Sequence, residues 1–231
     1  MRIVTWNCQM ALHRKIDPLL SLNADVAVIP ECSEKSVIAC GQYRFNTLWF
    51  GSNPRKGLGI ICREDWLIRP LPQPEQKWIV PLHVGSPVPF TLIAVWACAA
   101  GVRREDRYIR QVYLALTAHP EWFDGEAVIV AGDFNSNKIW DRKRRVGNHS
   151  DVVKLLGSHG LVSAYHEHRN EAHGAETCPT FHLFRHKDKP YHIDYIFLPQ
   201  AWKSRLEGVE VCKYEDWSKM SDHCPLFLDV S

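Results

Sequence analysis

The chain has 231 residues, a mass of 26.6 kDa, 45% hydrophobic residues and a formal net charge of +2. This size and composition predict one folded domain over residues 1–231 with a sizeable core, and they exclude a disordered or fibrous protein. The small net charge neither requires nor excludes a polyanionic partner.

No apolar run reaches the length of a membrane span, and the opening segment, Arg2 to Trp6, is typical of a strand rather than a secretory signal. We therefore expect a cytoplasmic protein without a membrane partner, and a monomer. The eight cysteines include no Cys-x-x-Cys pair, which favours reduced thiols over zinc or redox sites. Cys8, Cys32 and Cys224 each follow a candidate site residue, so we expect them to fill the core behind the site.

Apolar segments of strand length recur along the chain, at residues 2–6, 25–29, 58–62, 90–96, 127–131, 193–198, 209–212 and 226–230. Helices are predicted at residues 13–22 and 104–119, and from an N-cap at Ser150 to Leu156. The proline-rich stretch 70–89 is expected to be irregular. Alternating strands and helices predict an α/β protein, and strands that follow one another without a helix predict mixed or antiparallel pairing in two sheets.

Polar residues follow the apolar run Ala127 to Ala131. Gly132 permits a turn or a close backbone approach, and Asp133 and Asn135 come directly after it. Open α/β sheets bind their ligands at this edge. The same residue types also form ordinary turns, so a simple strand-to-loop corner is the alternative.

Four further segments place a polar or acidic residue beside an apolar strand: Asn7, Glu31, Asp194 and the pair Asp222-His223. Each has a structural explanation by itself, such as a turn cap for Asn7 or a helix N-terminal carboxylate for Glu31. Together with Asp133 and Asn135 they form an ordered set that chance rarely supplies.

Read in order, Trp6-Asn7, Pro30-Glu31, Gly132-Asp133-Phe134-Asn135, Ile193-Asp194-Tyr195 and Ser221-Asp222-His223 resemble the endonuclease/exonuclease/phosphatase superfamily. The resemblance extends from Asn7 to His223. It implies a four-layer α/β/β/α sandwich of two mixed sheets, as in pancreatic deoxyribonuclease, with one site at an edge of the sheets. It also implies a metal-dependent hydrolase that acts on phosphate esters.

The resemblance assigns Mg²⁺, or Mn²⁺ as a substitute, to Glu31 as principal ligand with Asn7 and Asp222. Magnesium prefers one or two carboxylates and keeps several waters. Relatives that cleave abasic sites usually carry an acid two residues after the first Asn, but Gln9 stands here. We therefore expect one metal ion.

The remaining set would carry catalysis. His223 resembles the site histidine of the family, with Asp194 accepting its second ring proton. Asp133 would orient and deprotonate the attacking water, and Asn135 would donate to a phosphate oxygen. Alternatively, His223 is the base. The sequence leaves open which of the two takes the proton.

Candidate substrate-binding residues are Trp96, Trp140, His192, His182 and Arg144. Trp96 stands where relatives place a phosphate-binding Tyr, and its indole can donate but not accept a hydrogen bond. His192 is expected on the strand face of Asp194. Trp140 and Arg144 belong to the basic segment Lys138 to Arg145, either a phosphate-gripping arm or a solvated loop. The other histidines are expected to be solvated or capping.

Three functions follow from this reading. The leading prediction is a magnesium-dependent phosphodiesterase with a nuclease-like substrate, DNA or RNA. The alternative keeps the chemistry but acts on a small phosphorylated metabolite, a nucleotide or a lipid head group. The third is a binding module of the same fold without catalysis, which the complete residue set disfavours.

Overall fold

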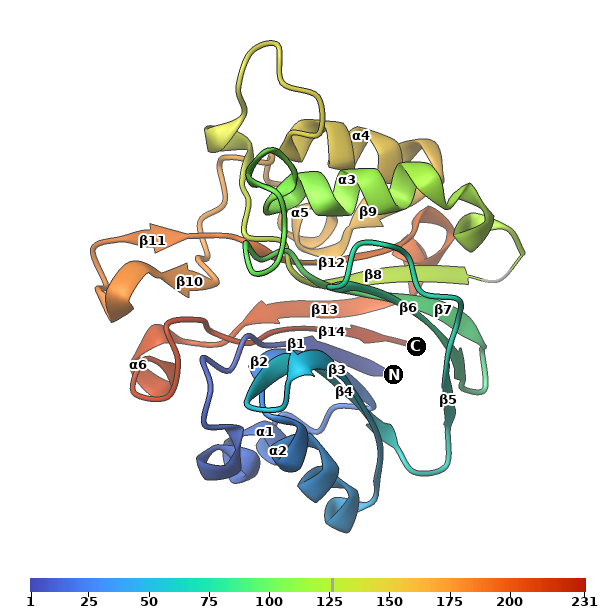
Figure 1. Cartoon of the computed structure of the whole chain (residues 1–231), viewed down its shortest axis with the longest axis vertical. Helices are drawn as coiled ribbons and strands as arrows, with labels where there is room; N and C mark the ends of the chain where they lie inside the picture. The colour runs from blue at the N-terminus through green and yellow to red at the C-terminus, as the bar shows by residue number, and fades with distance from the viewer. Residues whose placement is uncertain (126) are drawn as a thin grey trace.

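The computed structural model describes residues 1–125 and 127–231, and it shows two six-stranded sheets packed face to face between helices (Figure 1). The predicted α/β/β/α sandwich of mixed sheets is thereby confirmed. The first sheet has the order β13 (Leu206–Val211), β14 (Leu226–Val230), β1 (Arg2–Thr5), β2 (Val26–Cys32), β4 (Lys56–Arg63), β3 (Phe45–Asn53).

The second sheet repeats the mixed arrangement. Its parallel pair is β7 and β8, as β1 and β2 are in the first sheet, and its other neighbours run antiparallel. Its order is β5 (Leu67–Pro70), β6 (Ile79–Gly85), β7 (Phe90–Trp96), β8 (Ala127–Asp133), β12 (Asp194–Pro199), β9 (Leu161–Ser163). A short hairpin of β10 (Phe181–His182) and β11 (Pro190–Tyr191) projects from the edge (Figure 1).

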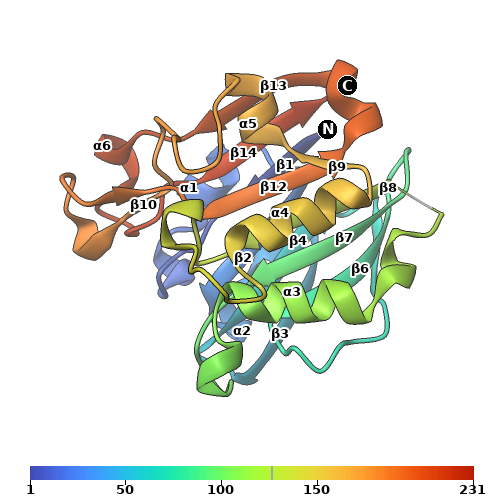
Figure 2. The same ribbon diagram turned by 90° about the horizontal axis from the view of Figure 1, so that it is seen from above.

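Helices cover the outer face of each sheet. The outer layer over the second sheet contains α3 (Ile109–Ala118) and α4 (His149–Ser158), which lie across it in Figure 2. Against the first sheet lie α1 (Ile16–Ser21) and α2 (Glu34–Ala39). Two shorter helices are α5 (Ala164–Arg169) and α6 (Tyr214–Trp217). None of the helices in the described residues is long and apolar enough to cross a membrane.

Short 3-10 turns join these elements, at Leu12–Arg14, Cys40–Tyr43, Arg104–Asp106, Pro120–Phe123, Lys138–Trp140, Leu183–Arg185 and Gln200–Arg205. They explain two differences from the predicted helices. The segment 13–22 divides into a 3-10 turn and α1. The segment 104–119 begins with a 3-10 turn and becomes α-helical only from Ile109. The third helix begins earlier than predicted, because Asn148 rather than Ser150 is its N-cap, in a capping box with Asp151.

Three hydrophobic clusters hold the layers together. The central cluster lies between the sheets and contains Val28 and Ile60 from one sheet and Leu92 and Ile129 from the other, all fully buried. One outer cluster joins the second sheet to its helices, and another joins the first sheet to its helices. Alternating residues of one strand therefore serve two cores, as expected for strands buried on both faces. Cys8, Cys32 and Cys224 are buried as predicted.

The proline-rich stretch 70–89, predicted to be irregular, is irregular at residues 71–78 and 86–89 but not between them. Residues 79–85 form β6, in which Pro81 lies opposite Ile93 of β7. Proline removes one donor from a sheet but keeps its carbonyl, and the carbonyl of Pro81 accepts from the backbone N–H of Leu71. The surrounding apolar residues outweigh the missing hydrogen bond.

Candidate active site

Asp133 is the last residue of β8 and lies in a row of three residues across the second sheet. Trp96 of β7 and Asp194 of β12 are its direct neighbours in register. Gly132 precedes it with φ +148°, and a Cβ there would lie 1.9 Å from the carbonyl oxygen of Val95. Glycine at this position therefore permits the close approach of β7 to β8.

The first sheet contributes the residues that meet Asp133. Asn7 follows β1, and its Nδ2 donates to Asp133 Oδ2 at 2.9 Å across the gap between the sheets. Asn135 supplies two more donors to the same carboxylate, its backbone N–H to Oδ1 and its Nδ2 to Oδ2, both at 2.8 Å. Ser221 fixes Asn7 from behind by donating to its backbone carbonyl at 2.7 Å. Asp133 is thus held by amide donors from two separate segments.

Glu31 lies at a bulge in β2. The register between β2 and β4 shifts from Pro30 to Cys32, and Glu31 has a left-handed backbone with φ +63°. Such bulges reorient a side chain and are frequent near functional sites. The side chain is 20% exposed, and its Oε2 accepts an ion pair from Lys56 Nζ at 2.8 Å.

His223 and Asp194 form a buried pair. His223 Nδ1 donates to Asp194 Oδ2 at 2.8 Å, which leaves Nε2 for another partner. Thr180 positions the carboxylate, because its Oγ1 accepts the backbone N–H groups of both Ile193 and Asp194 at 3.0 Å. Trp6 Nε1 in turn donates to the carbonyl of His223 at 3.1 Å. These contacts join segments from both ends of the chain.

The buried charges shift one another's pKa values. Burial, followed by the charge of Asp194, raises the pKa of Asp133 to about 7. Burial alone would lower the pKa of His223, but the charge and hydrogen bond of Asp194 raise it to about 10. Asp133 is therefore a stronger base than an ordinary aspartate, and His223 is a cation at neutral pH.

The donor set around Glu31 fits a hard divalent cation. Glu31 and Asp222 supply carboxylates and Asn7 supplies an amide oxygen, the ligand types that magnesium prefers. Burial raises the pKa of Asp222, and the charge of Glu31 raises it further, so the two carboxylates repel each other. A cation between them would remove this repulsion. At this site, the ligand atoms that all lie within 4.8 Å of one another are those of Asp133, Asp194 and His223.

A cavity of about 390 Å³ opens beside these residues. Glu31, Asn135, Lys56 and Trp96 are among its lining residues. Trp96 is buried, and its Nε1 has no hydrogen-bond partner among the described residues. A buried donor without a partner is costly, so this N–H is an unsatisfied polar group in a residue that lines the cavity.

The other predicted substrate-binding residues lie in different surroundings. Trp140 is 44% exposed with its ring 5.0 Å from that of Tyr191, and Arg144 is exposed in the loop that follows. His182 is buried against the ring of Tyr214, beside a separate cavity of about 350 Å³. None of them lines the cavity beside Glu31.

The position of His192 differs from the prediction. Its Nδ1 bonds to the carbonyl of Cys178 at 2.7 Å, and its ring contacts Tyr165 and Tyr195. Tyr195 follows Asp194 in β12 and therefore points to the opposite face of the sheet. The expectation that His192 shares the face of Asp194 fails because β12 begins only at Asp194, so strand alternation does not extend to residue 192.

Three other histidines, expected to be solvated or capping, are mostly withdrawn from solvent. His149 and His166 are buried and His173 is half-buried, in one group with His192. The sequence did not predict this cluster because its histidines are far apart in the chain and show no metal-ligand spacing within one segment.

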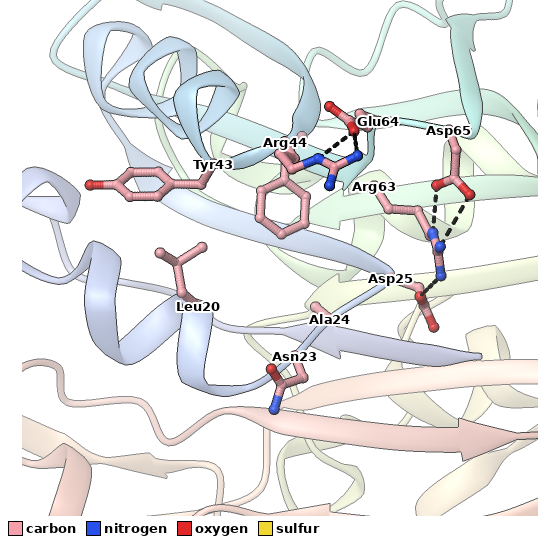
Figure 3. Close-up of a pocket in the computed structure, with 10 residues that line it drawn as sticks. Leu20, Asn23, Ala24, Asp25, Tyr43, Arg44, Arg63, Glu64 and Asp65 are labelled. Carbon is pink, nitrogen blue, oxygen red and sulfur yellow. Dashed lines mark hydrogen bonds and ion pairs between the residues drawn. The ribbon is translucent and has the colours of Figure 1, made fainter.

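A hollow of about 690 Å³ lies at the other end of β2 and does not belong to the site (Figure 3). Arg63 there pairs with Asp25 at 2.9 Å and with Asp65, and Arg44 pairs with Glu64. Because these guanidinium groups are already paired within the hollow, they are poorly disposed to bind an anionic ligand.

Sequence reasoning missed Lys56 and Thr180. Lys56 begins β4, which runs antiparallel to β2, so its first residue necessarily lies beside the last residues of β2. Once the pairing of β2 with β4 is known, a lysine at the start of the buried strand β4 therefore indicates a cation beside Glu31. Thr180 gave no such signal, because its role depends on a loop folding back onto the start of β12.

Residues 4–223 match the Endonuclease/Exonuclease/phosphatase family. No curated protein matches the sequence. Among solved structures, a 3' phosphatase named NExo from Neisseria, bound to a product DNA hairpin, is 19% identical with a TM-score of 0.73, over 100% of this chain and 99% of that one. An AP endonuclease from Archaeoglobus fulgidus is 17% identical with a TM-score of 0.73, over 100% and 99% of the two chains. The chain belongs to the endonuclease/exonuclease/phosphatase family.

Proposed function

We propose that the protein is a magnesium-dependent phosphodiesterase that cleaves nucleic acid. The observation that carries this proposal is the convergence of Asn7, Asp133 and Asn135 with the Asp194–His223 pair at one edge of both sheets. Phosphodiester hydrolysis requires a base for water and donors for the charge that develops on the phosphoryl oxygens. These five side chains supply both.

Asp133 acts as the base in this proposal, and His223 donates to a phosphoryl oxygen. Asp194 occupies the Nδ1 side of His223 and leaves Nε2 free to donate. Asp133 Oδ2 accepts hydrogen bonds from Asn7 and Asn135, whereas Oδ1 accepts one, from the backbone N–H of Asn135, and so retains a lone pair for the water proton. Glu31, Asn7 and Asp222 would hold magnesium, which supplies charge neutralisation at the phosphate when bound.

A cluster of arginines supports a nucleic-acid substrate. With Glu105, five arginines line a cavity of about 590 Å³ next to the site: Arg104, Arg107, Arg142, Arg145 and Arg110, of which Arg110 also pairs with Asp106 at 3.1 Å. Tyr108 lines both this cavity and the one beside Glu31. The additional phosphates of a polymeric substrate would lie against these guanidinium groups, which bind phosphate oxygens well.

The size of the cavity beside Glu31 supports a second candidate. About 390 Å³ is within the range of small-ligand sites, so a phosphorylated metabolite or nucleotide would fit without the arginine cluster. The two substrates differ in how many phosphates they present, and this difference can be measured.

The test is a panel of DNA, RNA and small phosphate esters assayed with magnesium over a range of salt concentrations. We expect kcat/KM for the nucleic acid to fall steeply with salt, and Arg142→Ala and Arg145→Ala to reduce the log–log slope by about 1 each. Arg69→Ala, which removes an exposed arginine elsewhere, is the matched control. A preference for a small ester with a flat salt profile selects the second candidate, and activity that survives chelation rejects both.

A further inference from the structure

A group of polar side chains lies behind the loop that carries Asp133 and Asn135. His166 at α5 and His173 and Glu176 in the loop after it have ligand atoms that all lie within 4.8 Å of one another. His149, the first residue of α4, joins them through its Nε2, which is 3.1 Å from His173 Nδ1. Two helices and one loop thus meet at three imidazoles and one carboxylate.

Glu176 gives this group a buried negative charge. Its side chain is 4% exposed, and within the described residues its ion-pair partner is His166, at 3.1 Å, rather than a lysine or arginine. Burial alone would raise the pKa of Glu176, but hydrogen bonds from His166, the backbone of Gly174 and Asn137 hold it below its ordinary value. A buried carboxylate needs compensation by a charge or a metal ion.

The imidazole nitrogens lie close enough together to share one ion. His149 Nε2 and His173 Nδ1 are joined by one hydrogen bond at 3.1 Å, so one carries a proton that a metal ion would displace and the other carries a lone pair. His149 is 1% exposed, and its Nδ1 has no hydrogen-bond partner among the described residues. The rings of His166 and His173 are stacked with centroids 3.5 Å apart, which places two potential ligands side by side.

The loop is held by hydrogen bonds rather than by apolar packing, as where Glu171 accepts from Tyr165 and Thr177. Residues 170–177 form no helix or strand, and their side chains are small or polar except for the imidazole of His173. Loops of this composition bury little apolar surface against the entropy of ordering. A metal ion that binds side chains from the loop and from two helices would supply this cross-link.

We propose that His166, His173, Glu176 and His149 bind one zinc-type transition-metal ion with a structural role. Histidine nitrogen and carboxylate oxygen are zinc ligands, and a set of four matches the closed tetrahedral sites of structural zinc. Tetrahedral ligands at about 2.0–2.1 Å from zinc lie about 3.3 Å apart, close to the 3.1 Å that separates His149 from His173 and His166 from Glu176.

The position of the ion explains what it would stabilise. Asn137 Nδ2 donates to Glu176 Oε2 at 3.1 Å and to the carbonyl of His192 at 2.9 Å. Asn137 follows Asn135 by two residues, and His192 precedes Asp194 by two. The zinc would therefore hold together the two segments that position Asp133 and Asp194, without touching the substrate.

The experiment measures zinc content and thermal stability, so its outcome does not depend on the proposed phosphodiesterase activity. Protein without a polyhistidine tag is stripped with chelator, reconstituted with zinc chloride and analysed by elemental mass spectrometry. The Glu31→Gln background removes the principal ligand of the separate site at Glu31. We expect one zinc per chain in this background and an increase in Tm of about 5 °C or more on adding zinc.

His173→Ala and Glu176→Gln in the same background should each lose the zinc and the increase in Tm. Glu176→Gln keeps an acceptor for the backbone N–H of Gly174 and guards against a simple folding defect. His168→Ala is the matched control, because His168 is exposed two residues from His166 and should leave both readings unchanged. Absence of zinc after reconstitution, or retention of the full zinc content of the Glu31→Gln parent in both His173→Ala and Glu176→Gln, overturns the proposal.

Discussion

Asp133 occupies the position where most of the constraints on this site meet. It is fully buried, accepts three hydrogen bonds from Asn7 and Asn135, and lies between Trp96 and Asp194 on the neighbouring strands. Two atoms of these neighbours, Trp96 Nε1 and Asp194 Oδ1, are buried without a hydrogen-bond partner among the described residues. Each such group needs an explanation, and substitution of the two side chains one at a time provides the test.

Asp194→Asn tests whether the charge behind His223 is needed for turnover. Asparagine keeps the size of the side chain but removes the negative charge that orients the imidazole of His223 and raises its pKa. We expect kcat to fall by about 10²–10⁴-fold, with an unchanged circular dichroism spectrum. Asp188→Asn is the control, because Asp188 is exposed in the β10–β11 hairpin. A kcat within twofold of the wild type would argue against a role of the Asp194–His223 pair in turnover.

Trp96→Phe tests the unpartnered indole N–H at the cavity. Phenylalanine retains an aromatic ring against Trp78 but cannot donate a hydrogen bond. A hydrogen bond to a charged oxygen contributes about 1.5–3 kcal/mol, so we expect kcat/KM to fall about 10- to 100-fold. Trp202→Phe, at another position of the same core cluster, should leave kcat/KM unchanged. Equal kinetics for the two variants would assign Trp96 to the core alone.

At the scale of the elements, strands buried on both faces could be predicted more readily than edge strands, although the edge strand β13 was predicted at residues 209–212. The cores of β1, β2, β7, β8, β12 and β14 appear in the sequence as continuous apolar runs. β3 is half-buried or exposed throughout, and β5 has four residues, so neither gives a clear apolar signal. Prolines concealed β6. Tertiary pairing, rather than local preference, creates these three strands.

Gly132→Ala tests the close approach of β7 and β8. The added Cβ meets the carbonyl of Val95 at 1.9 Å, and φ +148° is unfavourable for alanine. We expect the free energy of unfolding to fall by about 3 kcal/mol or more, measured by urea denaturation. Gly157→Ala in α4 meets no atom within 4 Å and should instead increase stability by about 0.5–1 kcal/mol. Similar effects for both glycines would contradict this reading of the sheet.

At the scale of the whole molecule, the site exists only when the two sheets are packed together. Asn7 and Glu31 belong to the first sheet and Asp133 and Asp194 to the second, and the bond from Asn7 to Asp133 joins them. The sequence could identify these residues because each stands beside an apolar strand and the set resembles one family. It could not identify Lys56, Thr180 or the histidine cluster, because their contacts depend on which strands, helices and loops meet in three dimensions.

The histidine cluster also predicts how stability depends on pH when metal is removed. Burial lowers the pKa of His149 to about 4, whereas the unfolded chain protonates near the ordinary value of 6.5. The unfolded state therefore binds more protons between these values. Stability contributed by the neutral ring is complete above about pH 6.5 and is lost as the pH falls toward 4.

Urea unfolding in chelator at pH 7.5 and pH 5 measures this loss. We expect the wild type to lose about 2 kcal/mol more than His149→Gln between the two values, since each pKa unit corresponds to 1.36 kcal/mol. His168→Gln, at an exposed position, should follow the wild type. An identical dependence on pH in the wild type and His149→Gln would show that His149 is not held neutral in the folded protein.

The most direct test of the proposed function is single-turnover cleavage of labelled DNA with magnesium by the wild type and Asp133→Asn, after both are shown to fold. The account predicts cleavage by the wild type that chelator abolishes, and a rate in Asp133→Asn at least about 10²-fold lower. Cleavage that continues in chelator, or at the wild-type rate in Asp133→Asn, would contradict it.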